Sequence, residues 1–214
     1  MKLAIFDLDG TLLDTIADLE GGCNTALTAM GFEKLKEGEC VTYVGNGVVK
    51  LLERSLPLSH RSTENVARAR KIFFEYYDSH LWDYTRPYPG ICEMLKTFQE
   101  RGVLLAVASN KYQSATERLV KHFFPEIKFV SVLGQREGVP IKPDPTIVEE
   151  ILNFAQVAKE DALYVGDSDV DMMTAQRAGV RSCGVTWGFK SREVLASYHP
   201  AFLADKTSDI LEII

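Results

Sequence analysis

Short apolar runs, bounded by polar or glycine residues, recur along the chain. They are Leu3–Phe6, Val103–Ala108, Phe129–Leu133, Ala162–Val165 and Arg181–Val185. Near-continuous hydrophobicity over so short a length is typical of strands that are covered on both faces. We therefore predict that each run is a buried strand of a parallel sheet.

Stretches with helical spacing alternate with the later runs. Apolar positions three and four residues apart occur within 91–98, 147–152 and 172–178. Gly102 and Gly179 follow the first and third stretches as natural C-terminal caps. Asp144 before Pro145 indicates an N-cap with proline at the first helical position. Strands alternating with helices predict an α/β fold, a doubly wound (Rossmann-like), mostly parallel sheet.

Residues 15–84 have a different pattern. They show helical spacing but little strand alternation, and Gly45-Asn46-Gly47 divides them into two halves. We predict a core domain of residues 1–14 plus 85–214 and an inserted α-helical domain of residues 15–84. Hinges are expected near Asp14-Thr15 and within 84–87.

Composition narrows the possible partners. The 214 residues are 46% hydrophobic and carry a net charge of −6, which argues against a general nucleic-acid binder. The four cysteines are scattered singly, as expected for reduced structural thiols. The N-terminal apolar run is too short for a signal peptide, and no run is long enough for a membrane span. We therefore expect a cytoplasmic protein without nucleic-acid or membrane partners.

Two carboxylates follow the first predicted strand, in the sequence Asp7-Leu8-Asp9-Gly10-Thr11. Open α/β sheets bind ligands at the carboxyl ends of their strands, and charges placed there are costly unless they are used. A simple turn is the alternative, since Asp-Gly pairs are common in turns.

A second acidic cluster, 166–171, follows the fourth predicted strand and opens a helix. Carboxylate oxygens gathered in this way suit a hard cation such as Mg²⁺. Asp167, at the strand end, is the best candidate ligand. Asp169 and Asp171 also fit first-turn acids that interact with the helix dipole, and for Asp169 this is the favoured interpretation.

Two further segments offer groups suited to phosphate. Ser109-Asn110 follows the second predicted strand and supplies a hydroxyl and backbone N–H groups at a helix start. Lys142 supplies an ammonium next to Pro143. Taken singly, each of these segments is better explained as ordinary solvated surface.

Together, the four motifs resemble the haloacid dehalogenase superfamily of aspartate-nucleophile phosphohydrolases. The resemblance covers essentially the whole chain, and the inserted helical segment resembles the cap domain of that superfamily. It implies that Asp7 is the nucleophile that forms an aspartyl-phosphate, and that Asp9 is the general acid and base. An acid at position 9 favours phosphate chemistry over dehalogenation, because a carbon–halogen bond needs no proton donor.

The resemblance also implies a magnesium site and a phosphate site. Mg²⁺ would be held by the Asp7 carboxylate, the Asp9 backbone carbonyl and Asp167, with Asp171 supporting from behind these ligands or through a water. The phosphoryl oxygens would be bound by the groups of Gly10, Thr11, Ser109, Asn110 and Lys142.

Within the superfamily, the chain is most similar to phosphoglycolate phosphatases. This similarity rests on segments 43–48, 51–54, 109–111 and 184–189. The expected partner is thus a small phosphorylated metabolite, acted on by a monomer or homodimer. Alternatives on the same scaffold are a sugar-phosphate phosphatase, a β-phosphoglucomutase-like mutase and a pyrophosphatase. A non-catalytic regulator that binds a phosphorylated ligand is disfavoured, because both Asp7 and Asp9 are present.

The inserted domain offers candidate specificity residues. Gly45, Asn46 and Gly47 would let a loop present backbone N–H groups to a second anion such as a carboxylate. A plain helix–helix turn explains the same residues as well. Lys50 and Arg54 are candidates for assisting a carboxylate, and a solvated helix face is the alternative.

Overall fold

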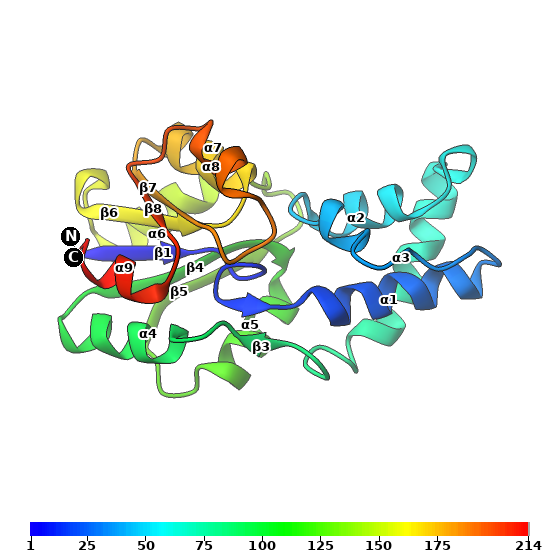
Figure 1. The fold of residues 1–214 in the computed structure, drawn as a ribbon, viewed down its shortest axis with the longest axis horizontal. Coiled ribbons are helices and arrows are strands. Elements are labelled where there is room, and N and C mark those ends of the chain that lie inside the picture. The colour runs from blue at the N-terminus through cyan, green and yellow to red at the C-terminus, as the bar shows by residue number, and fades with distance from the viewer. Residues whose placement is uncertain (214) are drawn as a thin grey trace.

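The computed structural model describes residues 1–213 and contains a six-stranded parallel sheet (Figure 1). The strand order is β5-β4-β1-β6-β7-β8. The strands are β1 (Leu3–Phe6), β4 (Leu104–Tyr112), β5 (Phe129–Gln135), β6 (Ala162–Gly166), β7 (Arg181–Val185) and β8 (Phe202–Ala204). The predicted α/β fold class is confirmed.

Helices cover both faces of the sheet, which explains why its central strands are apolar throughout. Successive side chains of β1 belong to two separate cores: Ala4 and Phe6 pack in one, Leu3 and Ile5 in the other. The helices of this layered domain are α4 (Ile91–Glu100), α5 (Gln113–Phe123), α6 (Thr146–Ala155), α7 (Asp169–Ala178), α8 (Arg192–Ala196), α9 (Thr207–Leu211) and the short 3₁₀ helix η3 (Lys159–Asp161).

The helices end at the predicted glycines, but helix α6 begins one residue later than predicted. Gly102 and Gly179 have positive φ angles of 75° and 70° just after α4 and at the end of α7. Helix α6, however, begins at Thr146, with Pro145 as its N-cap. The Asp144 carboxylate accepts a hydrogen bond from the Thr146 backbone N–H at 3.0 Å, so it caps from one position earlier than expected.

The segment between β2 (Leu13–Asp14) and β3 (Arg86–Pro87) is helical and lies beside the sheet domain, on the right in Figure 1. It contains α1 (Ile16–Ala29), η1 (Cys40–Thr42), α2 (Gly47–Ser55), η2 (Leu58–His60) and α3 (Thr63–Tyr77). Gly22 lets α1 approach α3 closely, because a Cβ there would overlap the ring of Phe73. We call this segment the cap.

The two segments that connect the cap to the sheet domain are hydrogen-bonded to each other. Strands β2 and β3 pair antiparallel, with Asp14 opposite Arg86. The buried carboxylate of Asp18 accepts hydrogen bonds from the backbone N–H groups of Tyr84 and Thr85 and from the Thr85 hydroxyl, at 2.7–3.1 Å. Both predicted hinge regions therefore belong to one small hydrogen-bonded unit. Movement of the cap about it stays a prediction.

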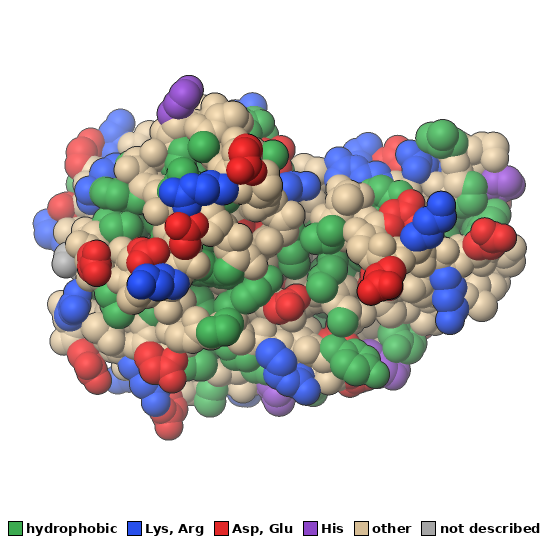
Figure 2. Space-filling view, viewed as in Figure 1, with side chains coloured by type: hydrophobic (Ala, Val, Ile, Leu, Met, Phe, Trp, Pro, Cys, Tyr) green, Lys and Arg blue, Asp and Glu red, His purple; other side chains and the backbone are tan. Residues whose placement is uncertain are grey.

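Acidic and basic side chains are interspersed over both parts of the face shown in Figure 2. Within residues 1–213, no helix combines the length and the apolar character needed to cross a lipid bilayer.

Candidate active site

The carboxyl ends of three adjacent strands bring the predicted motifs together. Strand β1 lies between β4 and β6, and its last residue, Phe6, pairs with Val107 and Val165. The Asp7 N–H then donates to the Val165 carbonyl at 2.9 Å. Because parallel strands end at the same edge of a sheet, Asp7 lies at the edge from which Ser109 and Asp167 also emerge.

Asp7, Asp167 and Asp171 form a compact buried acidic cluster. One carboxylate oxygen from each lies within 4.8 Å of the others, and none of the three residues is more than 8% exposed. Burial, followed by the negative charge of Asp171, raises the pKa of Asp7 to about 7. The same two causes raise the pKa of Asp167 well above its usual range.

Lys142 is the cation inside this cluster. Its Nζ lies 2.7 Å from Asp171 Oδ1 and 2.9 Å from Asp7 Oδ1. It also donates to the Ala108 carbonyl and the Tyr164 hydroxyl. Burial alone would lower the pKa of Lys142, but the charges of Asp171 and Asp7 outweigh it and raise that pKa well above its usual range. Lys142 is therefore a permanent positive charge beside Asp7.

The charge and donor set of the cluster fit a divalent cation. Lys142 pairs with Asp7 and Asp171, and Asp167 lies in the same cluster, so the ionised form of the three carboxylates leaves an excess of negative charge in a buried place. Among the described residues, the buried Oδ1 of Asp7 has no hydrogen bond of good geometry, and its contact with Lys142 at 2.9 Å is mainly an ion pair. Hard cations take oxygen ligands of this kind. Asp7 and Asp167 are the residues best placed to hold one.

Asp171 is held by the protein on both of its oxygens. Oδ1 receives Lys142 and the Tyr164 hydroxyl, and Oδ2 receives the Ser168 N–H and hydroxyl. Ser168 and Asp171 together form a capping box at the start of α7. Asp171 thus fixes Lys142 in place and has little capacity left for a ligand.

Asp167 is oriented by neighbours from two loops. Thr11 Oγ1 donates to Oδ1 at 2.9 Å, and the Phe189 N–H donates to Oδ2 at 2.7 Å. Gly10, at φ +86°, and Gly188 both pass so close that a Cβ on either would overlap the Asp167 side chain. Both glycines are required for this close approach of backbone to carboxylate.

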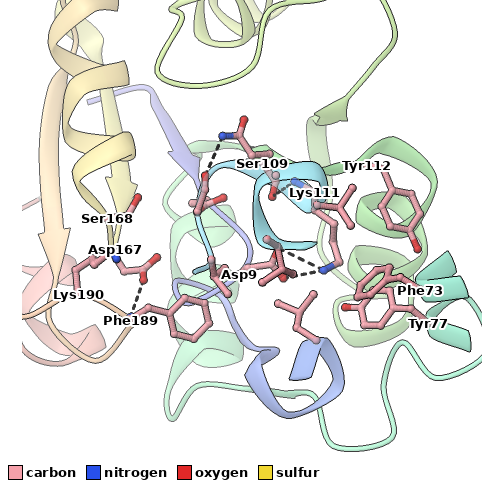
Figure 3. A pocket seen from close by; sticks show the side chains of 18 residues that line it. Asp9, Phe73, Tyr77, Ser109, Lys111, Tyr112, Asp167, Ser168, Phe189 and Lys190 are labelled. Atoms are coloured by element: carbon pink, nitrogen blue, oxygen red, sulfur yellow. Dashed lines mark hydrogen bonds and ion pairs between the residues drawn. The ribbon is translucent and has the colours of Figure 1, made fainter. Parts of the chain in front are cut away.

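Asp9 faces away from the acidic cluster, toward Lys111 (Figure 3). Its two carboxylate oxygens lie 3.0 and 3.3 Å from Lys111 Nζ. The side chains of Lys111 and Asp9 are 3% and 13% exposed. Burial would lower the pKa of Lys111, but Asp9 and the neighbouring Tyr77 hydroxyl together outweigh burial and raise that pKa. The result is a second, separate ion pair beside Asp7.

Ser109 and Asn110 line the same pocket as Asp7, and their binding of phosphate stays a prediction. The Asn110 side chain has a structural role. Its Oδ1 accepts from the Lys142 N–H, and its Nδ2 donates to the Lys142 carbonyl. The same Nδ2 donates to the Gly45 carbonyl of the cap at 3.0 Å. Asn110 therefore links β4, the lysine loop and the cap.

A pocket between the sheet domain and the cap contains most of these groups (Figure 3). Its sheet-domain wall includes Asp7, Asp9, Ser109, Asn110, Lys111, Tyr112, Asp167, Ser168, Phe189 and Lys190. Its cap wall consists of Leu19, Val44, Gly45, Gly47, Val48, Leu51, Phe73 and Tyr77. The cap contributes mainly apolar surface, which reduces water around the acidic groups.

The cap candidates divide into two groups. Gly45 and Gly47 line the pocket and have φ angles of +115° and +78°. Asn46, Lys50 and Arg54 do not line it. Arg54 instead donates to the Tyr43 carbonyl and to Asn46 Oδ1, so it braces the loop. Lys50 is exposed and pairs with Glu53. Which of these residues affect specificity stays a prediction.

Three side chains of the site have no sequence signal of their own. In the sequence, Tyr164 belongs to the apolar run of β6. Only the fold shows that its hydroxyl accepts a hydrogen bond from Lys142. Tyr77 ends α3 of the cap yet reaches the pocket. Trp187 donates from Nε1 to the Thr11 carbonyl at 3.0 Å and supports the loop that follows Asp7. Each depends on a contact between segments distant in sequence.

Comparison with known proteins gives a consistent result. The family model for haloacid dehalogenase-like hydrolases matches residues 4–185. A phosphoglycolate phosphatase of Vibrio parahaemolyticus is 32% identical over 100% of this chain and 96% of its own length. One from Mesorhizobium japonicum is 34% identical over 90% of this chain and 86% of its own length.

A similar solved structure is that of a predicted phosphoglycolate phosphatase from Haemophilus somnus. It has a TM-score of 0.92 and 29% identity, and it covers 100% of this chain and 97% of the other. The fold, the acidic cluster at the strand ends and the family match over most of the chain all point to the same family. The chain therefore belongs to the haloacid dehalogenase-like hydrolase family, and it is a phosphatase.

Proposed function

We propose that this phosphatase is magnesium-dependent and hydrolyses 2-phosphoglycolate to glycolate and inorganic phosphate, through an aspartyl-phosphate on Asp7. The observation that carries the proposal is the position of Asp7. Its carboxylate lies at the tip of β1 between Lys142 and Asp167, next to a pocket that also contains Asp9. The names of the similar proteins support the choice of substrate.

In the first step, an oxygen of Asp7 attacks phosphorus, and the bond between phosphorus and the glycolate oxygen breaks. The proton that the leaving oxygen needs comes from the carboxyl group of Asp9. Lys142 and the Ser109 hydroxyl stabilise the charge on the phosphoryl oxygens. The negative charge of Asp7 and that of the substrate repel each other, and the bound cation offsets that repulsion.

In the second step, Asp9 takes a proton from water, and the resulting hydroxide attacks phosphorus. The bond between phosphorus and Asp7 breaks, which releases phosphate and restores both carboxyl groups. Asp7 and Asp167, together with the Asp9 backbone carbonyl, would hold the Mg²⁺. Asp171 would not contact the phosphoryl group but would hold Lys142 in position. Gly10, Thr11 and Asn110 would offer backbone N–H groups to the phosphoryl oxygens.

The apolar cap wall supports the closed, water-poor pocket that such an intermediate requires. We propose that the cap opens about the Asp14 and Arg86 crossings to admit substrate. A cytoplasmic location and a monomeric or homodimeric state complete the proposal as predictions from the sequence.

The direct test measures phosphate release from a panel of esters: 2-phosphoglycolate, hexose phosphates, pyrophosphate and p-nitrophenyl phosphate. Each is assayed with Mg²⁺ and with a chelator. The proposal expects the highest kcat/KM for 2-phosphoglycolate and loss of activity with the chelator. Faster turnover of hexose phosphates would reject the substrate, and isomerisation without phosphate release would reject hydrolysis.

A further inference from the structure

Lys111 differs from Lys142 in how its ammonium is used. Lys142 Nζ donates to three groups and has a further ion-pair contact with Asp7. Within the described chain, the hydrogen bonds of Lys111 Nζ go to Asp9 alone. Lys142 is thus fixed by its surroundings, whereas Lys111 has one partner, which another anion can replace.

A second polar group lies beside Lys111. Tyr77, from cap helix α3, is fully buried, and its ring centroid lies 4.9 Å from Lys111 Nζ. In the part of the chain that the structure describes, its hydroxyl has no partner with good hydrogen-bond geometry, although it lies close enough to Lys111 to stabilise that ammonium. A buried hydroxyl without a partner is costly, and it is satisfied when a ligand supplies an acceptor.

Lys111 and Tyr77 lie in one part of the pocket, on the far side of Asp9 from Asp167 (Figure 3). The nearby cap wall is apolar, with Leu19, Leu51 and Phe73 among its residues. An ammonium and a hydroxyl set against apolar surface form a compact site for one anionic group.

We propose that Lys111 and Tyr77 bind the carboxylate of the leaving group, and that this binding frees Asp9 for acid–base work. Without substrate, Lys111 holds the Asp9 carboxylate. A substrate that brings its own carboxylate takes the place of Asp9 on Lys111. Asp9, no longer paired with an ammonium, takes up a proton from the monoanionic phosphate group of the substrate or from water, and turns toward the oxygen that leaves phosphorus. The inference rests on the proposed function and adds a mechanism for selecting anionic leaving groups.

The exchange makes the acid–base group responsive to the substrate. A phosphate ester without a second anion leaves the Lys111–Asp9 pair intact, and the proton donor stays turned away. An ester with a carboxylate replaces one ion pair by another at little net cost, because a buried cation keeps a partner throughout. Selectivity thus arises at the chemical step as well as in binding.

The test compares 2-phosphoglycolate with 2-hydroxyethyl phosphate, which has a neutral hydroxyl in place of the carboxylate. The measured quantity is the ratio of their kcat/KM values. Lys111→Met should lower this ratio about 100-fold, and Lys111→Arg should restore part of it. Tyr77→Phe, which removes only the hydroxyl, should lower the ratio about tenfold. Lys71→Met, the same charge change at an exposed position of cap helix α3, should leave it at the wild-type value.

A Lys111→Met variant that loses both activities equally would overturn the inference, since that is the result of a merely structural ion pair. A ratio that does not change would also overturn it. Circular dichroism spectra and melting temperatures establish that the variants are folded, and Tyr77→Phe gives an independent reading if Lys111→Met is not.

Binding separates this inference from the proposed function. Calorimetry on Asp7→Asn with Mg²⁺ measures affinity for both esters without turnover. Loss of the preference for 2-phosphoglycolate on adding Lys111→Met supports the anion site, even if the wild type hydrolyses another ester. Equal affinity for both esters before that substitution, or no binding of either, would reject the site.

Discussion

Lys142 Nζ lies 2.7 Å from Asp171 Oδ1, with the two side chains only 2% and 0% exposed. Removal of one partner from such a pair leaves the other charge buried without compensation. Lys142→Met should therefore destabilise the metal-free protein by about 3 kcal/mol, measured by urea denaturation, and should abolish phosphatase activity. Because Asp171 is the charge left behind, adding Asp171→Asn should recover part of the lost stability. Strictly additive effects of the two substitutions would show that the pair is not coupled.

The metal-free protein should lose stability as pH rises. Asp7 has a pKa of about 7 in the folded chain, against a pKa of 3.8 for an ordinary aspartate, so the folded state retains its proton over this interval while the unfolded state loses it. The free energy of unfolding should fall between these two values relative to Asp7→Asn, which lacks the titration. Chemical denaturation with a chelator at about pH 5 and about pH 7.5 measures this difference. A difference independent of pH would contradict the raised pKa.

Magnesium affinity should rise with pH over the same range, because the cation competes with the proton on Asp7. Calorimetric titration of Mg²⁺ should give weaker binding at about pH 6 than at about pH 8. Asp167→Asn, which removes the other main candidate ligand, should weaken binding at both values. Unaltered affinity in that variant would place the cation elsewhere.

Substitution of Gly188 tests whether the loop of Gly188 and Phe189 must pass close to Asp167 to orient it. A Cβ at this position would overlap the Asp167 side chain and the Gly10 carbonyl. Gly188→Ala should therefore weaken Mg²⁺ binding and lower kcat by about tenfold or more, because small displacements of reacting groups are costly. The control is Gly21→Ala in helix α1, where the added methyl meets only ordinary contacts with Tyr76. Equal effects of the two substitutions would contradict the close approach.

The junction between cap and sheet domain depends on Asp18. Its carboxylate accepts from the backbone N–H groups of Tyr84 and Thr85, and Asp18→Ala leaves the buried N–H of Thr85 without a partner. We expect a loss of about 1–3 kcal/mol in the free energy of unfolding and faster proteolysis near residue 84. Asp83→Ala, at an exposed neighbouring position, is the control. Proteolysis at the wild-type rate in Asp18→Ala would show that the junction is held by other contacts.

The sequence predicts the fold well where its signal is local. The apolar runs at Leu3–Phe6 and Ala162–Val165 require cover on both faces, so they specify central strands. Their C-terminal ends then bring Asp7 and Asp167 to one edge. Chain direction and strand burial are enough to infer that proximity, although the roles of these residues stay predictions.

Contacts between distant segments were not predictable in the same way. The spacing of Asp9 and Lys111 does not reveal their ion pair, because their distance depends on the pairing of β1 with β4. In the sequence, Asp18 fits an ordinary first-turn acid of α1. Its bond with Thr85 is visible only in the fold, where the segment that leads back from the cap contacts α1. The start of α6 was misplaced by one residue, because Asp144 caps from outside the helix.

The central claim is that Asp7 attacks phosphorus. Rapid quenching during turnover of 2-phosphoglycolate, followed by borohydride reduction, converts an aspartyl-phosphate to homoserine, which peptide mass spectrometry locates. The account predicts homoserine at position 7, and none in Asp7→Asn, whose kcat should fall by at least about four orders of magnitude. Homoserine at position 9 instead, or undiminished phosphate release by Asp7→Asn, would contradict it.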